Sequence, residues 1–333
     1  MTIYDIAKKC NVSIATVSRV LNGSGRVSAK TSEKVLAVIK EQDYNPNPFA
    51  RGLGLNSMKM IGVLCADVAD TFYAKAVSLI ENALRQKDLD VVLCCTGLND
   101  GKNAKYLRYL TKKHVDAIII IGTPLSSRSD VAELKKISSG IPIITINSDY
   151  HLPSAFSIVC DEKEGIRMIV RKLAEKNCRS ILYLYDTLTY SGRKKIVGYQ
   201  AGIEELSLDD TPALTQKIPC TLEAAENIVK KLIDDNVFFD AIVTSEDLLA
   251  VAAQRAALKN GKIVPIIGCN NSILAECSTP ALTSLDNRLE NLCTTAVHTV
   301  TQLMSEKSFT VPSKTVFSAQ LAERESFVFS NKK

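Results

Sequence analysis

Short apolar runs alternate with longer amphipathic stretches along the chain after residue 59. The runs in the first part of this region lie at 60–66, 90–95, 116–121 and 141–147, and the amphipathic stretches between them at 71–87, 103–113 and 130–139. Strands that are apolar throughout and alternate with helices are typical of a parallel sheet covered by helices on both faces. The pattern therefore predicts a doubly wound α/β unit.

The alternation repeats in the second part, which predicts a second, similar lobe. Its strand-like runs lie at 156–160, 179–185, 214–218, 239–245 and 262–269. A helix near 288–306 and a strand near 315–319 then predict that the chain crosses between the lobes more than once and leaves a hinged cleft. Ligands in such folds bind at the carboxyl ends of the strands, between the lobes.

The polar and apolar pattern of the first forty-four residues predicts three short helices. Thr2 is an N-cap with Asp5 at capping-box spacing, and the first helix ends at Asn11. Ser13 caps the second helix, which the glycines of the segment 22–25 break. The inward stripes of these two helices are Ile6, Ala7 and Cys10, then Val17, Val20 and Leu21.

The third helix is predicted to begin after Ser28 and to end near Tyr44, before two prolines. Its inward residues are expected to be Val35, Leu36 and Ile39. Three short helices with a tight turn between the first two have the geometry of a helix-turn-helix, whose second helix lies in the DNA major groove. A small structural bundle is the alternative that this pattern leaves open.

Charge is distributed unevenly between the two regions. The chain has a net charge of +5. Residues 1–60 alone contain nine basic and four acidic residues, so the whole excess of positive charge lies in this segment. A short basic module joined to a neutral body indicates that the first segment binds a polyanion. A solvated basic face would show the same charge.

Motifs for catalysis, metal binding and membrane insertion are missing. The glycines of 96–103 have the wrong spacing for a phosphate-binding loop, the segment 52–57 lacks the third glycine of a dinucleotide fingerprint, and no GxSxG or CxxC is present. Three widely separated histidines cannot form a local zinc site. No apolar stretch approaches the ~18 residues of a membrane span. We therefore expect no enzyme activity, no cofactor and no membrane association.

The N-terminus and the cysteines indicate a cytoplasmic location. The first ten residues contain charges and no apolar run with a cleavage site, so they do not form a secretory signal. Several of the ten cysteines lie in apolar runs, where free thiols behave as small buried hydrophobes; these are Cys65, Cys94, Cys95, Cys160 and Cys269. An exported solute-binding protein would share the two lobes, but it would need an export signal and would not use a basic helix-turn-helix.

The segment from Thr2 to Leu53, with VSIATVSRVLN as its second helix and NPNPFARGL after its third, resembles the DNA-binding headpiece of the lactose/galactose repressor (LacI/GalR) family. The resemblance continues loosely to LAERES near the C-terminus. It implies a helix-turn-helix headpiece, a hinge and a two-lobed periplasmic-binding-protein-like body of parallel doubly wound sheets. The expected boundaries are 1–45 for the headpiece, 46–58 for the hinge and 59–330 for the body, with lobe 1 at about 59–158 and 288–317 and lobe 2 at about 159–287 and 318–330.

The exposed face of the second helix carries small, hydroxyl and fork-shaped side chains, which suit base edges and phosphates. The resemblance assigns the roles. Bases would be read by Ile14, Ala15, Thr16 and Arg19 and phosphates held by Thr2, Ser13, Ser18 and Asn22, with Tyr4 and Arg26 completing the surface. Leu53 would insert into the minor groove at a central CpG step.

The hinge sequence around Gly52 and Gly54 favours disorder in the free protein, since each glycine costs a helix about 1 kcal/mol. We expect it to become helical only when two hinges pack together on DNA. A plain flexible linker is the alternative. The implied assembly is a homodimeric repressor on a palindromic operator with half-sites about one helical turn apart. The chain ends without a heptad tail, so no tetramer is expected.

Polar and aromatic residues follow several predicted strands and are the candidate ligand contacts. The set comprises Asp67, Phe72, Tyr73, Asn147, Lys195, Glu246 and Asn270, with Asp149, Asp247 and Asn271 beside them. Amides, carboxylates and aromatic faces suit a polyhydroxylated ligand, so a sugar or sugar derivative is the leading hypothesis. Each residue is equally consistent with a helix cap, and Glu246 and Asn271 lie where helices begin.

Several of these positions depart from the family pattern together. The family usually has arginine where this chain has Lys195, an aspartate at Asn147, Asn-Asp at 246–247 and two acidic residues at 270–271. Lysine lacks the planar fork of arginine. The sequence therefore leaves the identity of the effector open. The alternatives are an unusual sugar, a phosphorylated or anionic metabolite, a ligand unlike a sugar, or no effector at all.

Overall fold

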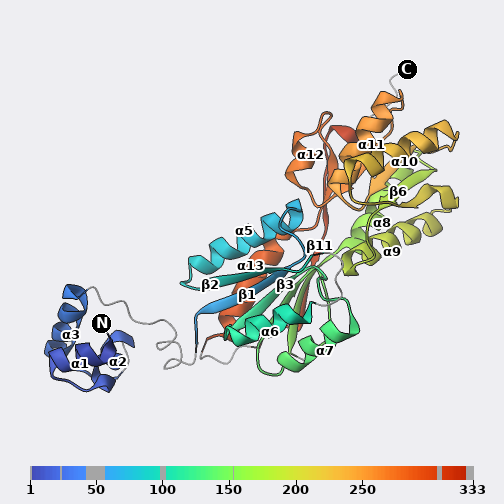
Figure 1. Ribbon diagram of the computed structural model, residues 1–333. Coiled ribbons are helices and arrows are strands. Elements are labelled where there is room, and N and C mark those ends of the chain that lie inside the picture. Colours follow the sequence, from blue (N-terminus) through green and yellow to red (C-terminus); the bar gives the residue numbers. More distant parts are fainter. Residues whose placement is uncertain are drawn as a thin grey trace.

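The computed structural model describes residues 2–22, 25–42, 57–97, 103–152, 154–305 and 310–327. They form a three-helix N-terminal domain and two α/β lobes, each built on a six-stranded sheet (Figure 1). The described residues exclude nearly all of the predicted hinge, including Leu53 and the glycines at 52 and 54. They also exclude Tyr44, the predicted end of the third helix.

The N-terminal domain contains α1 (Ile3–Cys10), α2 (Ile14–Asn22) and α3 (Ala29–Glu41). The predicted caps are confirmed. Asp5 accepts a hydrogen bond from the backbone N–H of Thr2 at 2.8 Å, and Asn11 ends α1 with a left-handed φ of 52°. The hydroxyls of Ser13 and Ser28 accept from the backbone N–H three residues on, at 3.1 and 3.2 Å.

The core of this domain is small. Its fully buried side chains are Ile6, Ala7, Cys10, Val17 and Val35. The prediction that Leu36 faces inward is wrong, because its side chain is 51% exposed. A helix turns by about 100° per residue, so Val35, Val38 and Ile39 stay on one face while Leu36 is rotated out of it.

The first lobe has an all-parallel sheet in the order β11-β5-β4-β3-β1-β2. Its strands are β1 (Met60–Cys65), β2 (Asp90–Cys95), β3 (Ala117–Ile121), β4 (Ile143–Ile146), β5 (Ala155–Asp161) and β11 (Lys314–Ser318). Its helices are α5 (Thr71–Arg85), α6 (Ala104–Lys112), α7 (Arg128–Ile137) and α13 (Leu289–Leu303). Helices α5 and α13 pack on one face of the sheet, and α6 and α7 on the other (Figure 1).

The second lobe repeats this arrangement with the sheet order β12-β10-β9-β8-β6-β7, in which only β12 is antiparallel to its neighbour. Its strands are β6 (Ile181–Tyr185), β7 (Thr215–Lys217), β8 (Ala241–Thr244), β9 (Ile266–Cys269), β10 (Thr283–Asp286) and β12 (Gln320–Ala322). Its helices are α8 (Glu162–Glu175), α9 (Tyr190–Glu205), α10 (Leu222–Asp234), α11 (Asp247–Lys259) and α12 (Ile273–Cys277). Short 3-10 turns lie at Pro212–Leu214 and Glu325–Phe327. None of the helices among the described residues is long and apolar enough to cross a membrane.

The predicted strands are confirmed, and two further strands, β10 and β12, escaped the pattern because they are short and not continuously apolar. The prediction that Cys95 is buried is wrong. Cys95 ends β2, the edge strand of its sheet, and is exposed, whereas Cys65, Cys94, Cys160 and Cys269 are buried as expected. An edge strand is covered less completely than a central one.

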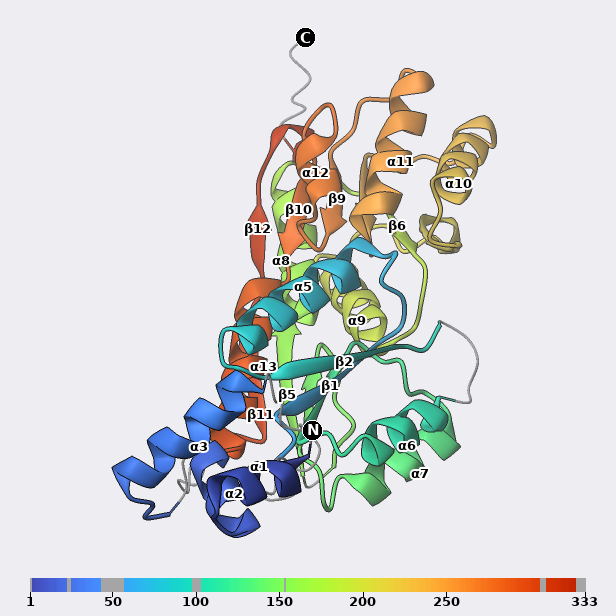
Figure 2. The same ribbon diagram turned by 60° about the vertical axis from the view of Figure 1, so that its left-hand side comes forward.

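The chain crosses between the lobes three times, as the pattern predicted in outline. The crossings follow β5, β10 and β11, and Figure 2 shows β11 of the first lobe leading into β12 of the second. They lie close together near Gly165, where an added Cβ would be 2.8 Å from the side chain of Ala319 and 2.9 Å from that of Leu285. The absence of a side chain at Gly165 thus allows the connecting segments to pack tightly.

Candidate functional site

A cavity of about 380 Å³ lies between the two lobes, at the carboxyl ends of strands from both sheets. This volume falls within the range of small-molecule sites, about 300–1,000 Å³. All seven residues of the leading sequence-predicted set line it, namely Asp67, Phe72, Tyr73, Asn147, Lys195, Glu246 and Asn270. The carboxyl ends of parallel strands meet at one edge, which is why residues far apart in the sequence converge here.

The first lobe supplies an aromatic wall at the start of α5. Asp70 caps this helix and accepts hydrogen bonds from the backbone N–H groups of Phe72 at 2.8 Å and Tyr73 at 3.3 Å. The two rings pack edge to face, with centroids 5.3 Å apart. Tyr73 also lies against Gly122, whose positive φ of 70° and missing side chain make room for the phenol. The cap thus fixes both rings at the cavity.

Two of the asparagines have conformations that few other residues adopt. Asn147 follows β4 with φ 50°, and Asn270 follows β9 with φ 96°. Asparagine enters this region more readily than other non-glycine residues. The side-chain oxygen of Asn147 accepts a hydrogen bond from the backbone N–H of Cys160 at 3.0 Å. Asn147 therefore joins β4 to β5 as well as lining the cavity.

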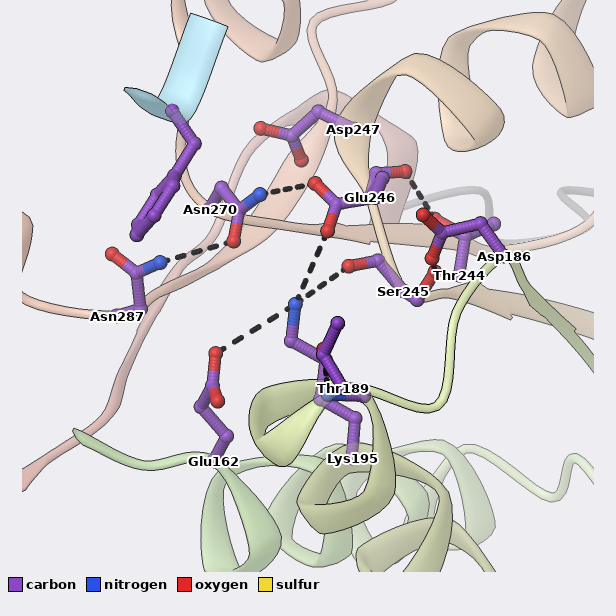
Figure 3. A network of polar contacts seen from close by, with 12 residues as sticks. Glu162, Asp186, Thr189, Lys195, Thr244, Ser245, Glu246, Asp247, Asn270 and Asn287 are labelled. Atoms are coloured by element: carbon purple, nitrogen blue, oxygen red, sulfur yellow. Dashed lines mark hydrogen bonds and ion pairs between the residues drawn. The ribbon is translucent and has the colours of Figure 1, made fainter. Parts of the chain in front are cut away.

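Lys195, on α9, is the centre of the polar network at the base of the cavity (Figure 3). Its side chain is 3% exposed. The ammonium group donates to the backbone oxygen of Ser245 at 2.7 Å and lies 3.6 Å from a carboxylate oxygen of both Glu162 and Glu246. A buried ammonium needs such partners, because removing it from water is otherwise costly.

The network continues from Glu246 across the cavity. Glu246 occupies the N-cap position of α11, but its side chain makes no capping bond and instead accepts a hydrogen bond from the amide of Asn270. Asn287 then donates to the Asn270 oxygen at 3.0 Å (Figure 3). The helix-cap alternative is therefore wrong for the Glu246 side chain.

Burial and neighbouring charges perturb both partners of the central pair. Burial raises the pKa of Glu246 to about 8; Lys195 opposes this rise, while Asp186 and Asp70 add to it. Burial alone would lower the pKa of Lys195, but Glu246 and Glu162 hold it well above its ordinary range. Lys195 is thus a permanent cation at physiological pH.

The remaining sequence candidates have other places. Asp149 and Asn271 line two adjoining hollows rather than this cavity. Asp247 is buried and accepts hydrogen bonds from the side chains of Ser272 at 2.8 Å and Ser284 at 2.5 Å, so it holds α11 to the β9 and β10 ends. The cavity residues that sequence reasoning missed include Asp70, Gly122, Thr123, Glu162, Asp186, Thr187, Thr189, Ser191, Cys220 and Asn287.

A strand-end rule applied to every strand would have found several of the missed residues. Glu162 directly follows β5, and Asp186 directly follows β6. Asn287 directly follows β10, a strand that the pattern did not predict. Their side-chain chemistry gave no further signal, since acidic residues also occur at helix starts.

The second candidate site is the surface of the N-terminal domain. Ile14, Ala15, Ser18 and Arg19 recur along α2 at helical spacing and are exposed or partly exposed, whereas Val17 is buried. Ile14, Ala15 and Arg19 are exposed, Thr16 and Ser18 are partly exposed, and the Thr16 hydroxyl shares a hydrogen bond of 2.9 Å with that of Ser13. Thr2, Tyr4 and Arg26 are exposed as well. The side chain of Asn22 lies outside the described residues.

Comparisons with known proteins match both regions. Residues 2–47 match the model of bacterial regulatory proteins of the lacI family, and residues 58–317 match that of periplasmic binding proteins and the sugar binding domain of the LacI family. An HTH-type transcriptional regulator of Lachnoclostridium phytofermentans is 41% identical over 99% of this chain and 100% of its own length. Catabolite control protein A of Priestia megaterium is 30% identical over 100% and 99%.

Solved structures share the fold. The lac repressor dimer bound to operator and the anti-inducer ONPF has a TM-score of 0.84 at 22% identity, over 98% of each chain. The transcriptional regulator CelR in complex with cellobiose has a TM-score of 0.68 at 24% identity, over 98% of this chain and 99% of its own. The predicted fold class is confirmed.

Proposed function

The chain belongs to the lacI family of bacterial regulatory proteins, and from that membership we propose that it represses transcription as a homodimer on a palindromic operator, under the control of a small molecule bound between its lobes. The family resemblance noted in the headpiece sequence is confirmed, and the chain is a helix-turn-helix transcriptional regulator. The observation that carries the regulatory part is the interlobe cavity, whose walls come from both lobes.

The proposed control is a two-state equilibrium of the lobes. A ligand that contacts both walls of the cavity stabilises one lobe arrangement, and operator DNA favours one separation of the two headpieces in the dimer. The lobes would rotate about the three closely packed crossings near Gly165. The coupling is reciprocal, so DNA must alter the affinity for the ligand by the same factor.

The proposed ligand is related to carbohydrate. The aromatic wall of Phe72 and Tyr73 suits the C–H face of a sugar ring, and the amides and carboxylates around it suit hydroxyl groups. The complex of CelR with cellobiose supports this class by analogy. The relatives are named as regulators, and we place this chain with them as a cytoplasmic protein without enzymatic activity or cofactor.

We divide the chain by function as the sequence indicated, with a DNA-binding headpiece over 1–45, a hinge over 46–58 and an effector-binding body over 59–330. The assignment of each strand to one of the two sheets supports lobe boundaries within a few residues of 158, 287 and 318. In the headpiece, Arg19 and the start of α2 would read bases, and the surrounding hydroxyl and basic residues, with Tyr4 and Arg26, would hold phosphates.

Selection of bound duplexes from a random DNA pool by the purified full-length protein tests the proposal. We expect a palindrome with half-sites about one helical turn apart and a central CpG step, bound less tightly as salt rises. No enrichment by a folded dimer, alone or with a metabolite mixture, would overturn it. Enrichment of a single, unpaired half-site would overturn the dimer.

Replacing Arg19 with alanine is expected to weaken binding to the selected operator by about 1–3 kcal/mol and to relax its sequence preference. Arg19 is exposed on α2 and forms no ion pair with a residue that the structure describes, so its guanidinium is available for base edges. Titration of operator and random duplexes measures the effect. Lys34→Ala, which removes an exposed headpiece charge from α3, is the control. Equal losses on both duplexes would reduce Arg19 to a phosphate contact.

A further inference from the structure

The interlobe cavity has an excess of acidic groups. Five carboxyl side chains line it, those of Asp67, Asp70, Glu162, Asp186 and Glu246, whereas its only lysine or arginine among the described lining residues is Lys195. That single ammonium already lies 3.6 Å from both Glu162 and Glu246. The other three acids have no ion-pair partner within the described part of the chain. Because Glu246, with a pKa of about 8, is mostly protonated at neutral pH, the uncompensated negative charge of the cavity lies on Asp67, Asp70 and Asp186.

Two of these acids come from opposite lobes and line the same cavity. Asp70 begins α5 in the first lobe, and Asp186 follows β6 in the second. Burial raises the pKa of Asp70, and the charges of Asp186 and Asp67 raise it further. Asp186 accepts a hydrogen bond from the Ser245 hydroxyl at 2.9 Å. The mutual repulsion of these carboxylates acts across the cleft and opposes its closure.

The base of the cavity also contains a buried hydrogen-bond acceptor without a donor among the described residues. This atom is Oδ1 of Asn287, a residue that is only 2% exposed, whereas the buried Oε1 atom of Glu162 has the ammonium group of Lys195 at 3.6 Å. Both residues line the cavity (Figure 3). Buried acceptors are normally satisfied, so the Asn287 oxygen indicates that a ligand with a hydrogen-bond donor completes the site.

A metal ion does not fit this arrangement as well as an organic cation does. Within the described residues, no group of three or more histidine, cysteine or acidic side chains is close enough to hold a metal. The acids are spread around a cavity of about 380 Å³ that also contains the rings of Phe72 and Tyr73. Aromatic faces and dispersed carboxylates together suit an ammonium group carried on a larger body.

We propose that the effector is a small polyhydroxylated amine, whose ammonium group binds between Asp70, Asp186 and Glu246 and one of whose hydroxyl groups donates to Asn287. This inference rests on the proposed function, because it assumes that the cavity is the effector site. Binding of the ammonium removes the repulsion between carboxylates of opposite lobes and so favours the closed arrangement. A phosphorylated or otherwise anionic ligand would add to that repulsion.

The test is a binding screen of the full-length protein by thermal shift, followed by calorimetry of the hits. The probes are matched triplets of hexoses: each 2-amino-2-deoxy sugar, its neutral parent and its 6-phosphate, extended with acyclic amino polyols and the corresponding neutral polyols. We expect the protonated amines to bind, and each neutral or phosphorylated counterpart to bind at least about tenfold more weakly. Tightest binding by a neutral or anionic member, or no binding by any amine, overturns the inference.

Two variants locate the ammonium group. Asp70→Asn and Asp186→Asn preserve the shape of each side chain, and asparagine is as good an N-cap as aspartate for α5. Each is expected to weaken binding of the amine by about tenfold or more, while Asp88→Asn, at an exposed turn after α5, leaves it unchanged. Thermal unfolding of each variant checks that it folds. Unchanged amine affinity in both folded variants would contradict the placement of the charge.

The same titrations separate this inference from the proposed function. An amine that binds with sensitivity to Asp186→Asn but leaves operator affinity unchanged would refute the proposed control of DNA binding and leave the charge inference intact. If a neutral sugar released or tightened operator DNA and the corresponding amine had no effect, the charge inference would be refuted and the proposed control of DNA binding would stand.

Discussion

Replacing Lys195 with methionine is expected to lower the free energy of unfolding of the two-lobed body by about 3–5 kcal/mol. The ammonium group is buried between the carboxyl groups of Glu162 and Glu246 and also donates to the backbone of Ser245. Methionine fills similar volume but supplies no charge and no donor. The variant therefore keeps Glu162, whose side chain is 2% exposed, without its only cationic neighbour among the described residues.

Urea unfolding followed by circular dichroism at neutral pH measures this loss. Lys194→Met is the matched control, since Lys194 is the preceding residue of α9 and is exposed. Adding Glu162→Gln to Lys195→Met removes the uncompensated charge and is expected to recover a large part of the lost stability. If Lys195→Met costs no more than Lys194→Met, the buried pair does not have the energetic role assigned to it.

The sequence predicted those features that depend on local chemistry or on periodicity. The Thr2–Asp5 cap, the left-handed Asn11 and the Ser13 and Ser28 caps involve residues within a few positions of each other, so spacing alone identifies them. The apolar strands were equally visible, because both faces of each central strand are covered. Such features depend on neighbouring residues in the sequence, so distant parts of the chain change them little.

The errors arise where tertiary packing decides the outcome. Leu36 is apolar and adjacent to the buried Val35, but the third helix turns only one face to its neighbours. Cys95 ends an apolar run, but that run forms an edge strand. Strand β12 was invisible because three residues without an apolar run carry no periodicity. In each case the deciding partner lies elsewhere in the chain.

The candidate site shows the same division. The residues predicted at strand ends meet at one cavity, because the topology of a parallel sheet gathers these positions at one edge, and Lys195 reaches the same cavity from α9. The charge balance of that cavity was not predictable, since Asp70 and Asp186 belong to different lobes and only the fold brings them together. A phosphorylated effector, which the sequence left open, is disfavoured by that balance.

The largest effect on DNA binding is expected from Ile6→Ala, although the side chain of Ile6 is fully buried and cannot contact DNA. Large-to-small substitution of a buried isoleucine typically costs about 2–5 kcal/mol. Among the described residues the headpiece core has five buried side chains, and a domain of this size has little stability to lose. We expect most headpieces of this variant to be unfolded at 25 °C and specific operator binding to fall by more than tenfold.

Calorimetry of the full-length protein should show that Ile6→Ala removes or lowers the headpiece transition while the transition of the two-lobed body stays in place. Leu36→Ala is the matched control, because it deletes the same number of carbon atoms from an exposed position of the same domain and should leave both transitions unchanged. Ligand binding in the interlobe cavity should survive both substitutions. Equal loss of operator binding in the two variants would mean that Leu36 is buried in the DNA-bound dimer, and retention of operator affinity by Ile6→Ala would show that the headpiece is stabilised by contacts beyond its own core.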